Sequence, residues 1–216
     1  KVAKGKEPKW EQYKELMKEH NVPDWYIKSC QKIKYMFPKA HAAAYVTNAF
    51  RIAWFKVHEP LAYYAAYFSI RGADDFDSDC MIFGKEKVKN KMKEIDLLGN
   101  NATQKDKAMY PILELVLEMY ERGFTFLPID LYKSHSTKFL VEEENGVRAI
   151  RPPLNSIPGL GTVAAQGIEK ARKDGKFMSI DDLMIRSKVG TSVTDLLKKY
   201  GCLDGMSQSN QMSLFA

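Results

Sequence analysis

Apolar residues recur at helical spacing through most of the first 122 residues. A first helix, ending near residue 21, is predicted from four such positions: Trp10, Tyr13, Leu16 and Met17. The same pattern predicts a helix that starts at 23–24 and further helices over 40–57, 61–70, 85–98 and 109–122. We expect the first four helices to form one cluster, with 61–70 buried because it is aromatic on nearly every face.

The apolar period changes after Gly123. Two short apolar runs, 138–141 and 147–150, flank the dipeptide Asn145-Gly146. An Asn-Gly pair between such runs is a strong signal for a β-hairpin. Residues 154–203 are predicted to form short helices joined by glycine-bearing turns. The pattern therefore indicates a mainly α chain that carries one small β-hairpin.

Composition narrows the class of protein without identifying a function. A chain of 216 residues with 45% apolar and 28% charged residues is globular, with a core large enough for one or two domains. Its net charge of +6 favours a polyanionic partner such as nucleic acid, but charge alone does not prove one. Cys30, Cys80 and Cys202 lack the spacing of a zinc site. With no signal peptide or long apolar run, we expect a cytoplasmic protein with no membrane partner.

The first candidate site is a glycine-containing loop at 156–162. Pro158, Gly159, Leu160, Gly161 and Thr162 precede an apolar helix, and such a loop presents bare backbone N–H groups where a phosphate is best accommodated. It resembles the helix-hairpin-helix DNA-binding motif, which grips the DNA backbone without reading sequence. The following helix adds three cations: Lys170, Arg172 and Lys173. The alternative is an ordinary turn that caps a helix.

A second loop at 188–192 looks like a degenerate copy of the first. It keeps one glycine, Gly190, so we expect it to support the fold more than it binds DNA. Together the two loops predict a tandem helix-hairpin-helix domain after the β-hairpin.

The helix that begins near Pro38 is the second candidate site. Lys39 and His41 lie beside its positive dipole end, and His41, Tyr45 and Asn48 fall on one face. The neighbouring alanines allow a flat partner to approach closely. The alternative is a buried helix in which the alanines are packing spacers.

The third candidate is the end of the chain. Residues 204–210 are polar and poor in large apolar groups, so we expect them to be flexible until bound. Gln211, Leu214 and Phe215 then combine one orienting amide with two apolar anchors. This pattern resembles the peptide with which bacterial DNA polymerases dock on the sliding clamp. The alternative is a tail whose apolar end packs on its own domain.

Five segments together resemble one family, the bacterial DNA polymerase III alpha subunit of the PolC type. They are KYMFPKAHAAAY (34–45), YAAYF (64–68), RGADDFD (71–77), NSIPGLG (155–161) and QMSLF (211–215). DnaE-type relatives carry a similar segment at 37–41 but continue past the hairpin domain, whereas this chain stops at the docking peptide. Because the chain also starts without Met, we expect a piece cut from a longer protein.

The resemblance implies a division of the chain into three parts. Residues 1–123 would belong to the polymerase fingers, 124–203 to the tandem helix-hairpin-helix domain that holds product duplex, and 204–216 to a flexible tail with the clamp peptide. Within the fingers, Lys39, His41, Tyr45 and Asn48 would border the incoming nucleotide or the template base.

The resemblance also implies what the parent protein does. It would be a DNA-directed DNA polymerase that uses primer-template DNA, deoxynucleoside triphosphates and Mg²⁺, carries a proofreading exonuclease, and binds the sliding clamp, the beta subunit of DNA polymerase III. No catalytic residue, metal site or cofactor is expected in this fragment, because the catalytic palm is absent. Two alternatives are a non-enzymatic adaptor that joins DNA to a clamp and a helix-hairpin-helix repair nuclease subunit.

The acidic run 75–79 imitates a calcium-binding loop. Cys80 stands where that loop needs glycine and Phe83 occupies a later ligand position, so we expect no metal there. We interpret the run as a solvated helix boundary.

Overall fold

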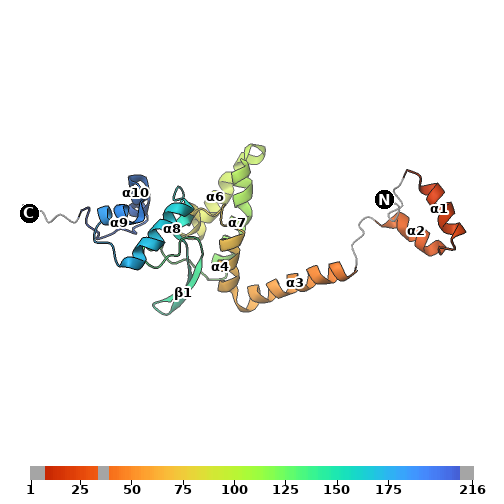
Figure 1. Cartoon of the computed structure of the whole chain (residues 1–216), viewed down its shortest axis with the longest axis horizontal. Coiled ribbons are helices and arrows are strands. Elements are labelled where there is room, and N and C mark those ends of the chain that lie inside the picture. The colour runs from red at the N-terminus through yellow and green to blue at the C-terminus, as the bar shows by residue number, and fades with distance from the viewer. Residues whose placement is uncertain (1–7, 34–38, 210–216) are drawn as a thin grey trace, which may run out of the picture. The chain divides into compact units, whose positions relative to one another are not determined.

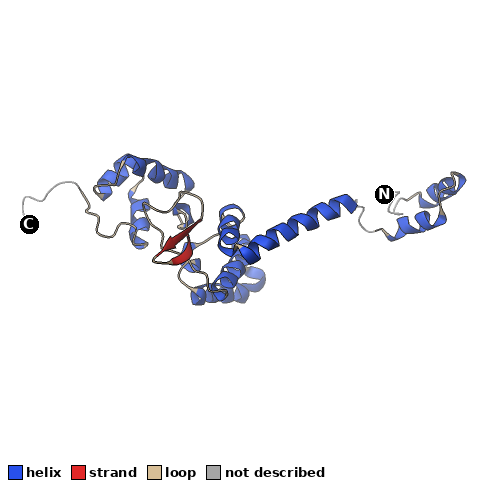
Figure 2. Ribbon diagram, turned by 90° about the horizontal axis from the view of Figure 1, so that it is seen from below, coloured by secondary structure: helices blue, strands red, loops and turns tan. Residues whose placement is uncertain are grey.

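The computed structural model describes residues 8–33 and 39–209 (Figure 1). Its helices are α1 (Trp10–Glu19), α2 (Asp24–Lys32), α3 (Lys39–His58), α4 (Pro60–Ile70), α5 (Ser78–Met81), α6 (Lys85–Leu98), α7 (Gln104–Glu121), α8 (Thr162–Ala171), α9 (Ile180–Ser187) and α10 (Thr191–Lys199). Two strands, β1 (Leu140–Glu144) and β2 (Val147–Arg151), and three short 3₁₀ turns, Gly99–Asn101, Leu154–Ser156 and Arg172–Asp174, complete these ranges. Apart from the one hairpin, the regular structure is helical (Figure 2), which confirms the mainly α prediction.

The chain divides into two compact parts, residues 1–53 and 54–216. In the first part, α1 and α2 bury a small core of Trp10, Ile27 and Cys30. No residue of α3 is buried. The packing of the first four helices into one cluster stays a prediction, because these helices are divided between the two parts. An amphipathic pattern says that a face is apolar, but it does not say which element covers it.

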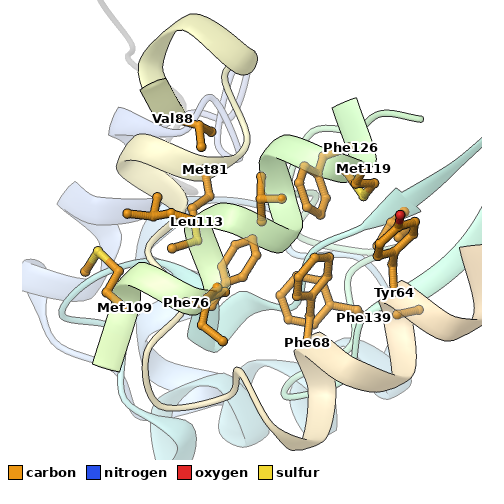
Figure 3. Packing of buried hydrophobic residues seen from close by; sticks show 14 of the residues in the cluster. Tyr64, Phe68, Phe76, Met81, Val88, Met109, Leu113, Met119, Phe126 and Phe139 are labelled. Carbon is orange, nitrogen blue, oxygen red and sulfur yellow. The ribbon is translucent and has the colours of Figure 1, made fainter. Parts of the chain in front are cut away.

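The larger part contains a first core built from α4, α6 and α7. Phe68 of α4 lies at its centre, with ring centroids 5.4 Å from Phe76 and 5.5 Å from Phe139 (Figure 3). Phe126 joins the same aromatic group, 5.8 Å from Phe68. Since Phe126 and Phe139 lie beyond Gly123, the segment around the β-hairpin completes the core of the preceding helices.

Helix α7 begins five residues before its predicted start at 109. Thr103 and Asp106 form a reciprocal capping box, in which each side chain accepts a hydrogen bond from the other residue's backbone N–H. Such a cap stabilises a helix start by about 1 kcal/mol. Apolar spacing did not predict this start, because the first turn of α7 consists of polar residues.

The β-hairpin has the predicted turn. Strands β1 and β2 pair antiparallel with Val141 opposite Ile150, and Asn145 and Gly146 both have positive φ, 54° and 78°. Arg151 at the end of β2 is only 2% exposed, and its buried charge is paired with carboxylates. Its guanidinium donates to the carboxylates of two β1 residues and to one backbone carbonyl, those of Glu142, Glu144 and Pro128.

A second core lies among α8, α9, α10 and the segment 129–131. Leu160, Ile168, Leu183 and Leu197 are buried in it. Gly167 of α8 permits the close approach of α9, because a Cβ at this position would lie 2.7 Å from the Ser187 carbonyl oxygen.

The acidic run connects the two cores. The Ser78 hydroxyl donates to the Ser156 hydroxyl at 2.9 Å in a buried contact. Asp79 accepts hydrogen bonds from the Lys199 ammonium at 2.7 Å and from the Tyr200 hydroxyl at 2.7 Å. The run is a helix boundary, as predicted, since Asp77 is the N-cap residue of α5, but its contacts with residues more than seventy positions away were not predicted.

Candidate nucleic-acid interface

The first hairpin loop has the backbone geometry that its sequence predicts. Gly159 adopts φ of +89°, which only glycine takes up without strain, and Leu160 is buried in the second core. Gly161 is the N-cap residue of α8, with an ordinary φ of −68°. A Cβ on Gly161 would meet no atom within 4 Å, so its missing side chain leaves the approach to the helix open without being needed for the turn.

The start of α8 offers unpaired backbone donors. Ala165 is the first amide of the helix to reach a backbone carbonyl, that of Gly161 at 3.1 Å. The amides of Thr162, Val163 and Ala164 have no hydrogen-bond partner within the described residues. Thr162 and Val163 are exposed. These N–H groups, at the positive end of the helix dipole, form a site suited to a phosphate oxygen.

Lys170 and Lys173 lie at the other end of α8. Both are exposed and border an open hollow of about 590 Å³, which Glu169 and Asp174 also line, so the exposed lysines and not the hollow are the candidates for phosphate contact. Lys170 follows Thr162 by eight positions, which places it about 12 Å further along the helix at the usual rise per residue. One phosphate cannot touch both ends, so the two lysines suit other phosphates of the same backbone.

Arg172 has a different environment from the two lysines. Its guanidinium donates to the Leu131 carbonyl oxygen at 2.7 Å and ties α8 to the preceding segment. Burial lowers the pKa of Arg172, against the opposing influence of Glu169 and Asp130. The bond to Leu131 assigns Arg172 a packing role, and its contact with DNA stays a prediction.

The second hairpin repeats the first residue by residue. Lys188 takes the place of Gly159 with a left-handed φ of 58°, and Val189 is buried as Leu160 is. Gly190 caps α10, and Thr191 begins it, as Gly161 and Thr162 do for α8. The missing glycine suggested a degenerate loop, but lysine adopts the required conformation here.

The start of α10 also leaves donors open. The amides of Thr191 and Ser192 have no partner in the part of the chain that the structure describes, whereas Val193 bonds to the Gly190 carbonyl at 3.1 Å. Lys188 is exposed beside them and makes no ion pair within the described ranges. Sequence reasoning missed these groups; the signal that could have found them is the repeat of a small N-cap residue before a threonine.

A cavity of about 310 Å³ separates the first hairpin from the loop 73–77. Asp74, Asp75 and Asp77 line one side, and residues 155–161 line the other. Lys105 is the one cation among the described lining residues, against three carboxylates that repel phosphate, so the cavity itself is not a candidate phosphate site. The open amides of α8 remain the site in this region.

The four predicted nucleotide-binding residues all lie on exposed turns of α3. The rings of His41 and Tyr45 are in contact, with centroids 4.5 Å apart, and Lys39 and Asn48 are exposed on the same helix. No residue of α3 is buried within the described chain, and the role of its four candidate residues stays a prediction.

The predicted clamp-binding residues, Gln211, Leu214 and Phe215, lie outside the described residues. The segment just before them is hydrogen-bonded to α9. The amides of Ile180 and Asp181 donate to the carbonyls of Ser207 and Gln208 at 2.9 and 3.0 Å. The polar composition of residues 204–210 did not predict these two hydrogen bonds.

Neither a metal site nor a membrane span is found in the part of the chain that the structure describes. Residues 8–33 and 39–209 contain no group of three or more His, Cys, Asp or Glu side chains that could hold a metal ion. The aspartates of the acidic run do not fit a metal pair, because Asp77 caps α5 and Asp79 binds Lys199 and Tyr200. No described helix is both long enough and apolar enough to cross a membrane.

Comparison with known proteins shows which proteins this chain is similar to. Residues 123–213 match the family model described as helix-hairpin-helix motif. Three curated proteins named DNA polymerase III PolC-type are similar to the chain along nearly its whole length. That of Caldanaerobacter subterraneus subsp. tengcongensis is 54% identical over 214 residues, which is 99% of this chain and 15% of that protein. That of Clostridium perfringens is 54% identical over 215 residues (100% and 14%), and that of Bacillus subtilis strain 168 is 53% identical over 213 (99% and 14%). The chain thus spans only about one seventh of these relatives, and the resemblance inferred from its motifs is confirmed.

Proposed function

We propose that this chain, a homologue along its whole length of a segment of PolC-type DNA polymerase III, is the duplex-holding part of a replicative DNA-directed DNA polymerase. The observation that carries the proposal is the row of open amides at the start of α8, behind a loop that keeps its approach free of side chains. In the longer protein, a deoxynucleotide would be added to a primer 3′ end, and residues other than those described would bind the Mg²⁺ that this reaction uses.

Backbone amides suit a protein that must hold every sequence equally. They donate to phosphate oxygens and have no reach into a groove, so they position the duplex without selecting bases. Lys170 and Lys173 add charge for neighbouring phosphates, and this contribution weakens with salt as counterions are released. A polymerase that moves along its product needs this kind of contact.

The exposed face of α3 supports a role toward nucleotide or template. His41 and Tyr45 present a polar ring and an aromatic ring side by side, and Lys39 supplies a cation at the helix start. In the longer protein, Lys39→Ala or His41→Ala should raise the Michaelis constant for deoxynucleotides or lower turnover. Unchanged steady-state kinetics in both variants would remove these residues from the site.

The hairpin assignment is tested by a matched pair of variants. Gly161 and Gly190 both have an ordinary φ and open space where a Cβ would stand, so valine at either should leave the fold intact. Gly161→Val places a branched side chain in front of the α8 amides. Loss of a charge-assisted hydrogen bond to phosphate corresponds to about 1.5–3 kcal/mol, or roughly a 10- to 100-fold weaker affinity.

The measurement is fluorescence anisotropy with duplexes of several unrelated sequences at fixed salt. Gly161→Val should weaken binding by a similar factor for every sequence. A Gly161→Val chain that binds as tightly as the unmodified chain would refute the phosphate assignment. Gly190→Val reports in the same assay on whether the second hairpin takes part.

The tail is proposed to dock on the sliding clamp through Gln211, Leu214 and Phe215. Deleting 211–215 should abolish association with a bacterial sliding clamp while duplex binding at low salt is kept. Clamp binding that survives the deletion would place the contact elsewhere.

A further inference from the structure

The backbone N–H groups in the first turns of α8, α9 and α10 differ in their hydrogen-bond partners. α8 and α10 begin with unpaired amides, as described above. In α9, by contrast, each of the first three amides has a partner. Asp182 donates to the Ser179 side chain at 3.1 Å, and Ile180 and Asp181 donate to the carbonyls of Ser207 and Gln208. The carbonyls come from residues far along the chain, near its end.

Side chains strengthen the same contact. The Gln208 amide donates to the Asp181 carboxylate at 3.0 Å, and its oxygen accepts from the Lys198 ammonium at 3.5 Å. The Ser207 hydroxyl lies 3.2 Å from the Ser209 carbonyl oxygen, within the same stretch, and 3.5 Å from that of Met178. Just before this stretch, Met206 packs partly buried on the second core and bonds back to Leu203. Residues 206–209 are therefore fixed to both α9 and α10, the helices of the second hairpin.

This fixation limits how far the docking peptide can reach. Gln211 follows Ser209 by two residues, which span at most about 7 Å of extended chain. If the chain were free from Leu203 onward, eight residues would allow about 28 Å. The segment 206–209 thus removes most of the slack between the hairpins and the peptide.

We propose that residues 206–209 form a strap that closes the start of α9 and fixes the exit of the C-terminal peptide beside the second hairpin. A protein partner taken by Gln211, Leu214 and Phe215 is then held next to the duplex rather than on a loose tether. The second half of this inference rests on the proposed function, since it takes the partner to be a sliding clamp on the same DNA. The closure of α9 does not depend on that function.

Amide hydrogen exchange tests the strap itself. A chain lacking 210–216 should protect the Ile180 and Asp181 amides as well as the complete chain does. A chain lacking 206–216 should exchange them at least about tenfold faster, since each loses its hydrogen bond. Continued protection of Leu197 shows that the domain is still folded. Equal exchange of Ile180 and Asp181 in the two truncated chains would overturn the strap.

A matched pair of glutamines tests the strap without truncation. Gln208→Ala removes two side-chain bonds of the strap and should speed exchange at Ile180 and Asp181 several-fold, while binding to free clamp is unchanged. Gln211→Ala should do the reverse, weakening clamp binding and leaving exchange as it was. Exchange that responds equally to both substitutions, or to neither, would also overturn the strap.

Tether length tests the consequence for binding. Ten Gly and Ser residues inserted after Ser209 leave the strap intact but lengthen the link from two residues to twelve. Binding is compared on bare duplex and on duplex carrying a loaded clamp. The gain from the clamp should fall about tenfold, because effective concentration declines with roughly the −3/2 power of linker length. An unchanged gain would overturn the fixed exit. Failure of the unmodified chain to bind clamp at all would overturn the tail assignment, and with it this use of the strap, while the exchange results for α9 would stand.

Discussion

Replacing Gly167 by alanine sets two well-known effects against each other. Glycine inside a helix costs about 1 kcal/mol relative to alanine, so helix propensity predicts that Gly167→Ala stabilises the chain. The packing of α8 on α9 predicts the opposite. A Cβ at Gly167 would lie 2.7 Å from the Ser187 carbonyl oxygen, closer than such atoms approach in proteins. The opposing atom belongs to the backbone, so it cannot rotate away.

The size of the effect follows from these two terms. Overpacking of a close contact costs about 1–3 kcal/mol, and a contact this short belongs in the upper half of that range. After the gain in helix propensity, we expect a net loss of about 1–2 kcal/mol. For a chain of this size, that corresponds to a midpoint lower by about 2–8 °C.

Thermal and urea unfolding followed by far-UV circular dichroism measure this loss. Gln166→Ala is the matched control, because Gln166 is the exposed neighbour on the same helix and should change stability by less than about 0.5 kcal/mol. A Gly167→Ala chain as stable as the original, or more stable, would show that α8 and α9 do not approach as described. The close packing of the two hairpins would then need revision.

Three further expectations concern charged groups. Burial raises the pKa of Asp79, but hydrogen bonds such as that from Lys199 outweigh it and leave the pKa below its ordinary 3.8. Asp79→Asn should therefore cost up to about 1 kcal/mol at pH 6, and the difference should shrink as the pH falls below 3.8, where Asp79 becomes protonated. A difference in urea midpoint that does not change with pH would contradict the bond. Arg151→Ala removes a buried guanidinium but leaves carboxylates that reach solvent, so it should cost about 1–3 kcal/mol in urea unfolding; a loss under about 0.5 kcal/mol would contradict the described contacts of Arg151. Lys170→Ala should reduce the slope of log affinity against log salt for duplex DNA by about 0.9, whereas an identical slope would exclude a phosphate contact.

Elements with strong local signals were predictable from the sequence. The limits of α6 agree with the prediction of 85–98, because Gly84 and Gly99 bracket a continuous run of helix formers. The β-turn follows from Asn145 and Gly146, both of which tolerate positive φ. The first hairpin loop is also local, since its conformation depends on Gly159 and its neighbours.

Features that depend on distant partners were not predictable in the same way. Arg151 reads as the exposed end of a strand, and only the pairing of β1 with β2 surrounds it with carboxylates. Asp79 belongs to a run that looks solvated until α10 supplies its cation. Lys188 reads as a departure from the hairpin motif, because composition does not reveal that a lysine adopts the left-handed conformation there. For Asp79 the deciding contact lies 120 positions away in sequence, and for Arg151 it comes from the pairing of two strands.

The closure of α9 by residues 206–209 also sets an order of events during synthesis. Ser207 follows Ile180 by 27 positions, so the carbonyls that complete this helix are made well after the helix itself. At roughly 5–20 residues per second, a translating ribosome delivers them on the order of seconds later. Throughout that interval the first turn of α9 lacks these two hydrogen-bond acceptors, so the second hairpin completes its folding only after Ser207 and Gln208 have been made.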